Sequence, residues 1–358
     1  MALAHAGARV LYCENPLSFL REPIRPLREI EKNIFVYRPA HFSHRLNRFS
    51  FFSRLQAKII ASEILRKAQE LKLKNPIFFY PHGECYRTLS FEMSRRRMAS
   101  THICMDYHIG EQLDHVRQSD LTLVIIEEAY RELHDLFGSK IHRLREFGPT
   151  STTNNKSQDL VVQPCALSSI PNPRLIYLGN VHGRIDLELV RQLLRKHKDW
   201  HFIAFGPEDC LGLPNSHFLP WMPPNEWSKV FNDYSIGFMP YDCSVPKNLH
   251  CAPLKLFDYF VRGIPIVSTP IVYLRDYPDL VYTGSTAEEL ATAVERALNE
   301  PADSPKKMRR TALVAKHSIE TMSRILSPLL DETAEFPPSY WEEDESAKPQ
   351  NLSALMLT

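Results

Sequence analysis

The sequence predicts an α/β protein made of two Rossmann-like, doubly wound domains. The chain has 358 residues, which is too long for one simple core and suits two domains of roughly 150 residues each. Short apolar strands, such as 121–126 and 174–178, alternate with amphipathic helices, such as 128–137 and 185–197. This alternation is typical of mainly parallel sheets that helices cover on both faces.

A polar stretch divides the chain into two such series. Residues 149–173 begin at Pro149, are mostly polar and follow no periodic pattern, so we interpret them as a linker. Beyond 332 the chain becomes acidic and rich in proline, and such segments bury too little apolar surface to fold. We therefore expect four parts: an N-terminal domain at 1–148, the linker at 149–173, a C-terminal domain at 174–332 and an acidic, disordered tail at 333–358.

The composition excludes several classes of protein. Hydrophobic residues make up 44% of the chain, charged residues make up 24%, and the formal net charge is +1. These values argue against a disordered protein and against nucleic-acid binding through overall charge. The seven cysteines form no CxxC pair, so neither a zinc site nor a disulfide framework is indicated. The chain lacks a run of eighteen apolar residues and a signal-peptide pattern, so we expect a cytoplasmic protein without a transmembrane helix.

The first domain is expected to be incomplete at its start. Residues 1–6 suit the last turns of a helix, Gly7 suits its C-terminal cap and 9–13 suit the following strand. A doubly wound domain normally opens with a strand and a tight turn before that helix, so we expect an upstream strand to be missing. The alternative is that this fold simply opens with a helix.

Two strands of the first domain lead into polar side chains. The strand 77–80 precedes His82 and Glu84, and the strand 101–108 ends on polar groups that include Asp106 and His108. Ligands bind at the carboxyl ends of the strands in open α/β sheets, so these four residues are candidates for acid–base chemistry. Asp106 is the strongest candidate because it directly follows an apolar strand. Each of the four can instead be a cap or a loop hydrogen-bond partner.

A basic and aromatic stretch precedes the long helix of the first domain. Cations and aromatic rings that alternate in this way suit the surface of an anionic membrane. A loop and helix that pack on their own domain are the commoner origin of such a stretch, and both interpretations stay open. The residues concerned are Arg45, Arg48, Phe49, Phe51, Phe52 and Arg54.

The second domain opens with a strand, a glycine turn and a helix. The turn runs from Gly179 and Asn180 to Gly183, and Arg184 lies at the start of the helix. Helix N-termini bind anions through their free N–H groups and their dipole, so the turn predicts a phosphate site. A plain tight turn is nevertheless the more common reason for a lone GxxxG.

The stretch 239–268 has the most specific pattern in the chain. It predicts a strand that ends at Pro240, a polar loop, a helix at 253–262 and a second strand. Lys255 lies in the first turn of that helix, where its charge opposes the helix dipole unless an anion is bound. Together with Arg184 it predicts one diphosphate site. The alternative is a solvated lysine on an ordinary crossover helix.

These motifs resemble those of glycosyltransferases with the GT-B fold, from the group-1 family that uses nucleotide-activated sugars. The resemblance covers about 174–330 and rests on YLGNVHGRIDLELV, FIAFGP, LPNSHFLPWMP, IGFMPY and above all PLKLFDYFVRGIPIVSTP. In the first domain it is limited to ARVLYCENP, ICMDYHIGE and SDLTLVIIEEAYREL. The family's Pro-x-Lys-x-x-Glu pattern places the lysine on the diphosphate and the acidic residue on the ribose hydroxyls. The matching residues here are Lys255 and Asp258, which is one methylene shorter than the usual glutamate.

The resemblance implies transfer of a sugar from a nucleotide diphosphate sugar to a glycan or lipid-linked acceptor in polysaccharide or glycoconjugate synthesis. No metal and no cofactor is expected. The second domain would bind the donor and the first the acceptor. If the reaction inverts the anomeric centre, Asp106 would deprotonate the acceptor hydroxyl; a retaining reaction needs no such base. The expected catalytic residues are Asp106, His108 and His82, and the expected donor-binding residues are Gly179, Asn180, Gly183, Arg184, Tyr241, Lys255, Leu256 and Asp258.

Two other functions stay open on the sequence alone. One is a non-catalytic nucleotide-sugar-binding or scaffold protein, which an incomplete first domain would suit. The other is a nucleotide-sugar epimerase, because that chemistry shares the fold. The expected partners are the donor, the acceptor and, through the basic and aromatic stretch, the inner face of a membrane; nucleic acid is not expected.

Overall fold

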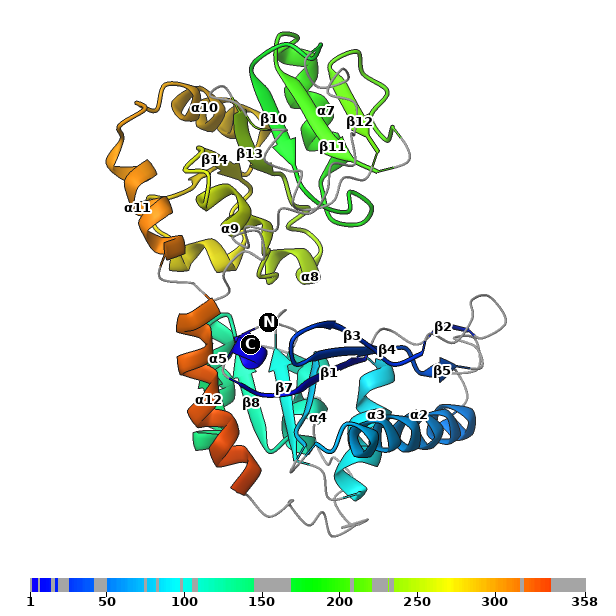
Figure 1. Cartoon of the computed structure of the whole chain (residues 1–358). Coiled ribbons are helices and arrows are strands. Elements are labelled where there is room, and N and C mark those ends of the chain that lie inside the picture. Colours follow the sequence, from blue (N-terminus) through cyan, green and yellow to red (C-terminus); the bar gives the residue numbers. More distant parts are fainter. Residues whose placement is uncertain are drawn as a thin grey trace.

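The computed structural model shows two α/β halves, drawn one above the other in Figure 1. Each half is built on a parallel sheet, so the predicted α/β class with two Rossmann-like units is confirmed. The residues that the structure describes are 2–5, 7–13, 17–18, 26–41, 50–73, 76–81, 84–96, 99–104, 109–144, 169–206, 209–220, 231, 235–315 and 319–335.

The first half contains a four-stranded parallel sheet with the strands in chain order. All of β8 is buried, as expected for a strand with helices on both sides. The carboxyl ends of the four strands lie at one edge, because the strands are parallel. The strands are β6 (Phe78–Pro81), β7 (Ser100–Cys104), β8 (Leu121–Val124) and β9 (Ile141–Arg143), and the connecting helices are α3 (Glu84–Arg95), α4 (Ile109–Gln118) and α5 (Glu127–Phe137).

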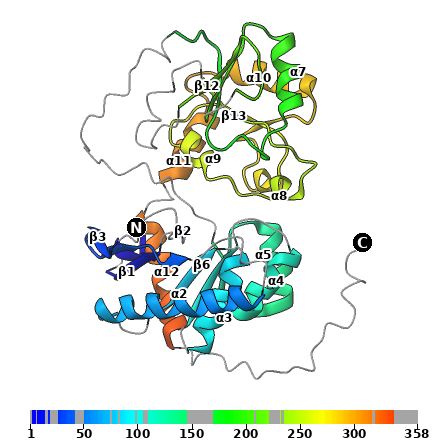
Figure 2. The same cartoon turned by 90° about the vertical axis from the view of Figure 1, so that its right-hand side faces the viewer.

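The N-terminal segment adds smaller elements beside this sheet. The expected helix, glycine cap and strand are present as α1 (Ala2–His5), Gly7 at φ 93° and β1 (Val10–Cys13). That a strand precedes α1 stays a prediction. Strand β4 pairs with β1 in parallel and with β3 in antiparallel fashion, and the long helix α2 lies beside α3 (Figure 2). The remaining elements are β2 (Leu17–Ser18), β3 (Arg28–Glu31), β4 (Ile34–Tyr37), β5 (Ala40–His41) and α2 (Ser50–Glu70).

The second half contains a six-stranded parallel sheet in the order β12-β11-β10-β13-β14-β15. When the six strands are numbered 1 to 6 along the chain, they lie side by side in the order 3-2-1-4-5-6, which is the order of a dinucleotide-binding Rossmann domain. The strand order reverses between β10 and β13, so the crevice at their carboxyl ends is the expected ligand site. The strands are β10 (Arg174–Tyr177), β11 (His201–Phe205), β12 (Ser216–Leu219), β13 (Ser235–Met239), β14 (Ile266–Ser268) and β15 (Tyr282–Thr283).

Helices cover both faces of this sheet. On one face, α7 (Leu187–Lys196) and α10 (Ala287–Leu298) bury apolar side chains such as Leu193 and Leu290. Their starts are fixed by side-chain caps: Asp186 accepts from the N–H of Leu189, and Thr286 accepts from the N–H of Glu289. On the other face lie α9 (Lys255–Phe260) and the 3₁₀ helix η5 (Val272–Asp276).

Helix α9 is shorter than the sequence predicts. The expected helix covers 253–262, whereas α9 covers Lys255–Phe260. Before it, the N–H groups of Leu256 and Phe257 donate to the carbonyls of Pro253 and Leu254 at 3.1 and 3.0 Å. The chain therefore enters the helix through a tight turn. The N–H groups of Leu256 and Phe257 are bonded within this turn and are not free to bind an anion.

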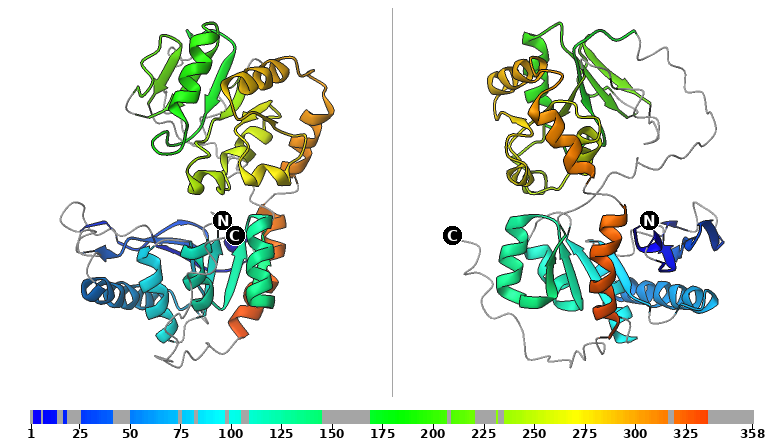
Figure 3. Two further views of the ribbon diagram at one scale, coloured as in Figure 1. Left: turned by 180° about the vertical axis from the view of Figure 1, so that it is seen from behind. Right: turned by 60° about the vertical axis from the view of Figure 1, so that its left-hand side comes forward.

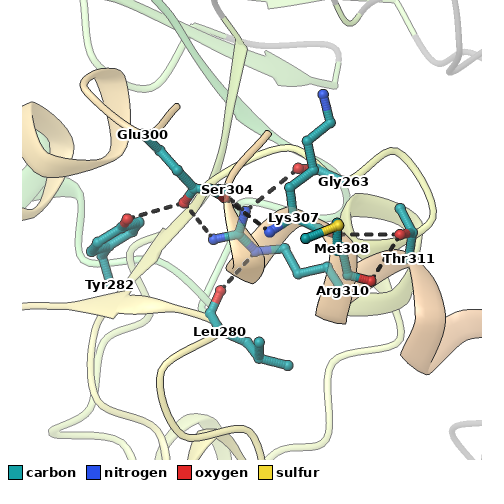
Figure 4. Close-up of polar contacts among 9 residues, drawn as sticks. All are labelled: Gly263, Leu280, Tyr282, Glu300, Ser304, Lys307, Met308, Arg310 and Thr311. Carbon is teal, nitrogen blue, oxygen red and sulfur yellow. Dashed lines mark hydrogen bonds and ion pairs between the residues drawn. The ribbon is translucent and has the colours of Figure 1, made fainter. Parts of the chain in front are cut away.

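A buried ion pair anchors the next helix, α11 (Pro305–Ala315), beside α9 (Figure 4). Arg310 has no exposed surface and binds Glu300 through both terminal nitrogens, at 2.7 and 2.8 Å. Its remaining donors reach the carbonyls of Leu280, at 2.9 Å, and Gly263, at 3.4 Å. Every nitrogen of the guanidinium is thus bonded, which is the condition under which a buried ion pair is tolerated.

The last described helix, α12 (Ile319–Glu335), lies against the first half (Figures 1 and 3). Met322 and Leu326 pack against Leu121, Leu123 and Leu144. The sequence order places residues up to 332 in the second domain, but the packing of α12 places 319–335 with the first. The physical reason is that the apolar side chains of α12 are buried against strand β8 of the first sheet. The expected linker at 149–173 and the tail lie mostly outside the described residues.

The two halves contact each other near the carboxyl end of β9. Arg143, at that end, forms an ion pair with Asp276 of η5 at 2.7 Å and another with Glu127 of α5. Arg275 of η5 pairs with Glu128 at 2.5 Å. Apolar residues around these pairs form one core that spans both halves. The carboxyl edge of the first sheet therefore faces the second half.

Candidate functional site

The candidate site lies at the carboxyl ends of β10 and β13, where the strand order of the second sheet reverses. Two loops meet there. The N–H of Asp186 donates to the carbonyl of Pro240 at 2.8 Å, and the N–H of Asp242 donates to the carbonyl of Arg184 at 3.0 Å. An isolated bridge between Ile185 and Tyr241 continues this contact. Backbone contacts thus join the glycine turn after β10 to the loop after β13, and the two together form the floor of the candidate site.

Asn248 ties these loops together, and the sequence analysis missed it. This buried side chain belongs to the short helix α8 (Pro246–Leu249). Its amide nitrogen donates to the carbonyls of Gly183, at 3.1 Å, and Asp242, at 3.2 Å. Its amide oxygen accepts from the guanidinium of Arg184 at 3.4 Å. Asn248 therefore orients Arg184, but a lone asparagine in a polar loop carries no pattern that would reveal this role.

The glycine turn lets a lysine approach the backbone closely. Gly179 has φ of 125°, and a Cβ atom at this position would lie 2.9 Å from the Nζ atom of Lys255. The positive φ requires a glycine here, and the missing Cβ atom also lets the amine of Lys255 approach the backbone. Asn180 stabilises the turn, because its side-chain oxygen accepts from the N–H of His182 at 3.0 Å.

The amine of Lys255 lies over aromatic rings and not in open solvent. Its Nζ atom is 3.8 Å from the ring centre of Tyr177 and 5.3 Å from that of Tyr241. Burial lowers the pKa of Lys255 from 10.5 to about 7, and the charge of Arg184 acts in the same direction. Among the described residues no carboxylate forms an ion pair with this amine. The lysine is thus a desolvated cation without a counter-ion.

Asp258 follows Lys255 by one helical turn. Burial raises the pKa of its carboxyl to about 6, while the nearby charges of Arg262 and Lys255 oppose this shift. The guanidinium of Arg262 donates to the backbone carbonyl of Asp258, at 2.5 Å, and not to the carboxylate. In the part of the chain that the structure describes, the carboxylate has no hydrogen-bond partner. It can therefore accept hydrogen bonds from hydroxyl groups of a ligand.

The remaining expected residues differ in their positions. The Leu256 side chain has no exposed surface and lies in the core, and its N–H is bonded to Pro253, so neither group is available to a ligand. Gly179, Asn180, Gly183, Arg184, Tyr241, Lys255 and Asp258 all come from the two loops and α9. The expected catalytic residues His82, Asp106 and His108 lie outside the described residues and stay predictions.

The described residues do not contain a group of three or more His, Cys, Asp or Glu side chains that could hold a metal ion. They also include no helix with both the length and the apolar character needed to cross a membrane. The site itself offers two cations, one carboxylate and backbone groups at the end of a parallel sheet. This arrangement suits a ligand that carries both negative charge and hydroxyl groups.

Solved structures share this two-domain arrangement. The trehalose-phosphate synthase (UDP-forming) from Burkholderia vietnamiensis matches with a TM-score of 0.62 and 8% sequence identity, over 92% of this chain and 96% of that one. The chain has the GT-B fold. A protein from Listeria monocytogenes that is named as a UDP-N-acetylglucosamine 2-epimerase matches with a TM-score of 0.50 and 12% identity, over 87% and 86% of the two chains. The fold alone therefore does not separate transferases from epimerases.

One curated protein is similar in sequence. TuaH of Bacillus subtilis (strain 168), named as a teichuronic acid biosynthesis glycosyltransferase, is 27% identical over 152 residues. The match covers 37% of this chain and 37% of TuaH, so it spans little more than a third of that relative. No protein-family model matches the chain.

Proposed function

We propose that the chain is a glycosyltransferase that moves a sugar from a nucleotide diphosphate sugar to a glycan or lipid-linked acceptor. The observation that carries the proposal is the pair formed by Lys255 and Asp258 at the point where the strand order reverses. Each is buried enough to shift its pKa, and neither has a partner of opposite charge within hydrogen-bond distance among the described residues. Buried polar groups are usually paired, so a ligand that pairs them is the economical explanation.

The chemistry of the donor fits these groups. Its diphosphate would lie against Lys255 and Arg184, and its ribose hydroxyls would donate to Asp258. In the reaction the bond between the anomeric carbon and the diphosphate oxygen breaks, and a bond to the acceptor oxygen forms. Negative charge then builds up on the leaving diphosphate, and the two cations stabilise it. We propose that this occurs without a metal or other cofactor.

The first half would bind the acceptor. Arg143 brings the carboxyl edge of the first sheet toward the second half, and along the chain His82, Asp106 and His108 follow two strands that end at this edge. We propose Asp106 as the base that removes the proton of the acceptor hydroxyl if the reaction inverts the anomeric centre. In a retaining reaction Asp106 would only position that hydroxyl.

The acceptor class is a growing polysaccharide or its lipid-linked precursor. The name of TuaH supports synthesis of a bacterial polysaccharide. At the start of α2 the side chains of Phe51, Phe52 and Leu55 are exposed, together with Arg54. Aromatic and basic side chains of this kind suit peripheral contact with an anionic membrane. A cytoplasmic protein at the inner face of a membrane would meet such an acceptor.

An epimerase is the second candidate, because one structural neighbour is named as a UDP-N-acetylglucosamine 2-epimerase. The test is to incubate the purified chain with UDP-, GDP- and ADP-linked sugars, with and without an extract of lipid-linked glycans. Release of free nucleoside diphosphate only with the extract supports the transferase. A donor that changes without the extract supports the epimerase, and donor binding without any turnover supports a non-catalytic protein.

A further inference from the structure

The surroundings of Lys255 form a corner of two aromatic rings. The rings of Tyr177 and Tyr241 are 6.4 Å apart and nearly perpendicular, at 76°. Both side chains are buried, so their faces are available to the amine of Lys255 and not to water. The sequence analysis places Tyr241 in the donor site and Tyr177 in a strand, and it does not connect either ring with the lysine.

The sheet holds both rings in place. Tyr177 is the last residue of β10, and its hydroxyl donates to the carbonyl of Asn180 at 3.0 Å. Tyr241 follows β13, and its backbone bridges to Ile185 in the facing loop. Gly179 leaves room for the amine, since a Cβ atom at this position would lie 2.9 Å from the Nζ atom. The corner is therefore built before a ligand arrives.

The two rings oppose the effect of burial. Burial favours the neutral amine, whereas the negative faces of aromatic rings favour the ammonium ion. The rings attract the ammonium form without an ion pair to a carboxylate. Such a carboxylate would compete with a diphosphate for the positive charge of the amine. The other groups that face it are Cys251 and Asp258, which favour the charged form, and Arg184, which disfavours it.

We propose that Tyr177 and Tyr241 are positioning residues, which form an aromatic seat that increases the charged fraction of the Lys255 amine and holds it dehydrated and free of a counter-ion until a donor diphosphate binds. The inference rests on the proposed function, because it assumes that a diphosphate is the ligand. Preorganisation of this kind raises affinity, since the ammonium is already desolvated and oriented before binding.

The proposal predicts different effects of leucine and phenylalanine at the two tyrosines. Tyr177→Leu and Tyr241→Leu remove a ring and should weaken binding of the matching nucleoside diphosphate about fivefold to thirtyfold, which is about 1–2 kcal/mol. Tyr177→Phe and Tyr241→Phe keep the ring and should bind within about twofold of wild type. Calorimetric titration with UDP, GDP and ADP measures these affinities.

A second measurement reports on the charge of the lysine itself. In protein with ¹³C-labelled lysine side chains, an NMR titration gives the midpoint for Lys255, whose signal is assigned by its loss in Lys255→Arg. The leucine variants should lower this midpoint by about one pH unit, because the amine stays buried but loses a ring. The phenylalanine variants should leave it unchanged. A purely structural role for the tyrosines would not produce this pattern.

The matched control is Tyr282, a buried tyrosine of the same domain whose ring also lies under a lysine. The Nζ atom of Lys306 is 4.2 Å from its ring centre, and Tyr282→Leu should change neither nucleotide affinity nor the Lys255 midpoint. The seat is refuted if Tyr177→Leu and Tyr241→Leu match this control, or if the phenylalanine variants lose as much as the leucine variants. If wild type binds no nucleoside diphosphate, the proposed function fails, while the NMR titration still decides whether the seat exists.

Discussion

At the scale of single residues, Lys255 should contribute most to donor affinity. Lys255→Ala removes a charge-assisted hydrogen bond to the diphosphate and should weaken nucleotide binding by about 1.5–3 kcal/mol. The fold should persist, because the substitution removes a half-buried lysine that forms no ion pair with the described residues. Calorimetric titration measures the affinity, and Lys247→Ala, at an exposed lysine of α8, is the control for loss of one charge. Equal affinities of the two variants would mean that Lys255 does not contact the diphosphate.

Asp258 should act on a different part of the same ligand. Asp258→Asn weakens the acceptors for the ribose hydroxyls, so it should reduce affinity for nucleoside diphosphates about tenfold while leaving affinity for inorganic pyrophosphate unchanged. Asp258→Glu restores the length that the family pattern uses and should retain binding. Competition of both ligands against a fluorescent nucleotide measures the two effects separately. An equal loss for pyrophosphate would place Asp258 near the phosphates instead.

Donor affinity should also fall with rising pH. Burial lowers the pKa of Lys255 to about 7 in the free protein, and a bound diphosphate raises it again by favouring the ammonium form. Binding therefore takes up a proton above pH 7, and affinity should fall by up to about tenfold per pH unit there. The titration uses nucleotide sugars, since the terminal phosphate of a free nucleotide itself titrates near pH 6. Lys255→Arg stays charged and should give a flat profile between pH 7 and 9, so a slope equal to that of wild type would contradict the assignment.

The sequence predicted the residues that carry charge at the site better than those that support them. Lys255, Arg184 and the glycine turn have recognisable spacing, and the structure brings them together. In the sequence Tyr177 is indistinguishable from other strand residues, because its role depends on contact with Lys255, which lies far away in the chain. Asn248 belongs to no recognisable sequence motif. Supporting residues act through tertiary contacts, and a single sequence does not encode those contacts locally.

At the scale of elements, strand and helix types followed from periodicity, but their ends and order did not. The pattern of 253–262 fits a helix, and the structure shortens it to Lys255–Phe260 because a tight turn uses the first N–H groups. The order of the strands in the second sheet depends on which strands pair across long stretches of chain. It places β10 beside β13 and so creates the site.

Arg310 should be essential for the stability of the second half. Replacing it with methionine leaves the buried Glu300 side chain with Ser304 and Tyr282 as its hydrogen-bond partners among the described residues, so the free energy of unfolding should fall by about 3–5 kcal/mol. Urea denaturation followed by circular dichroism measures this change. Arg309→Met, at the exposed neighbour on α11, should change stability by less than about 0.5 kcal/mol. A loss of similar size in both variants would show that the buried ion pair is not what anchors α11.

At the scale of the whole molecule, the chain crosses between its halves and then returns. Helix α12 packs against α1 and the first sheet, although it follows the second domain in sequence. No local pattern distinguishes an apolar face that packs on its own domain from one that packs on the other. The pairs of Arg143 with Asp276 and of Arg275 with Glu128 are equally non-local. The sequence therefore did not predict on which domain α12 packs or which residues join the two domains.

How the whole molecule meets its acceptor gives the last prediction. The start of α2 exposes Phe51, Phe52 and Arg54, and Arg45 and Arg48 precede it in the chain, outside the described residues. Each basic residue near an anionic membrane contributes about 1 kcal/mol, and rings that enter the interface add to this. The protein should therefore sediment with vesicles of phosphatidylglycerol at low salt and leave them at high salt, because salt screens the attraction.

The variant with all three arginines changed to glutamate should stay in the supernatant at low salt. Arg66→Glu on the same helix is the control, because Arg66 is exposed and lies farther along α2, so this variant should still sediment. The double variant Phe51→Ala and Phe52→Ala separates the aromatic part from the charge, since it should bind more weakly but keep its dependence on salt. Wild type that stays in the supernatant at low salt would make the start of α2 an ordinary domain surface, and a soluble glycan would then be the better acceptor.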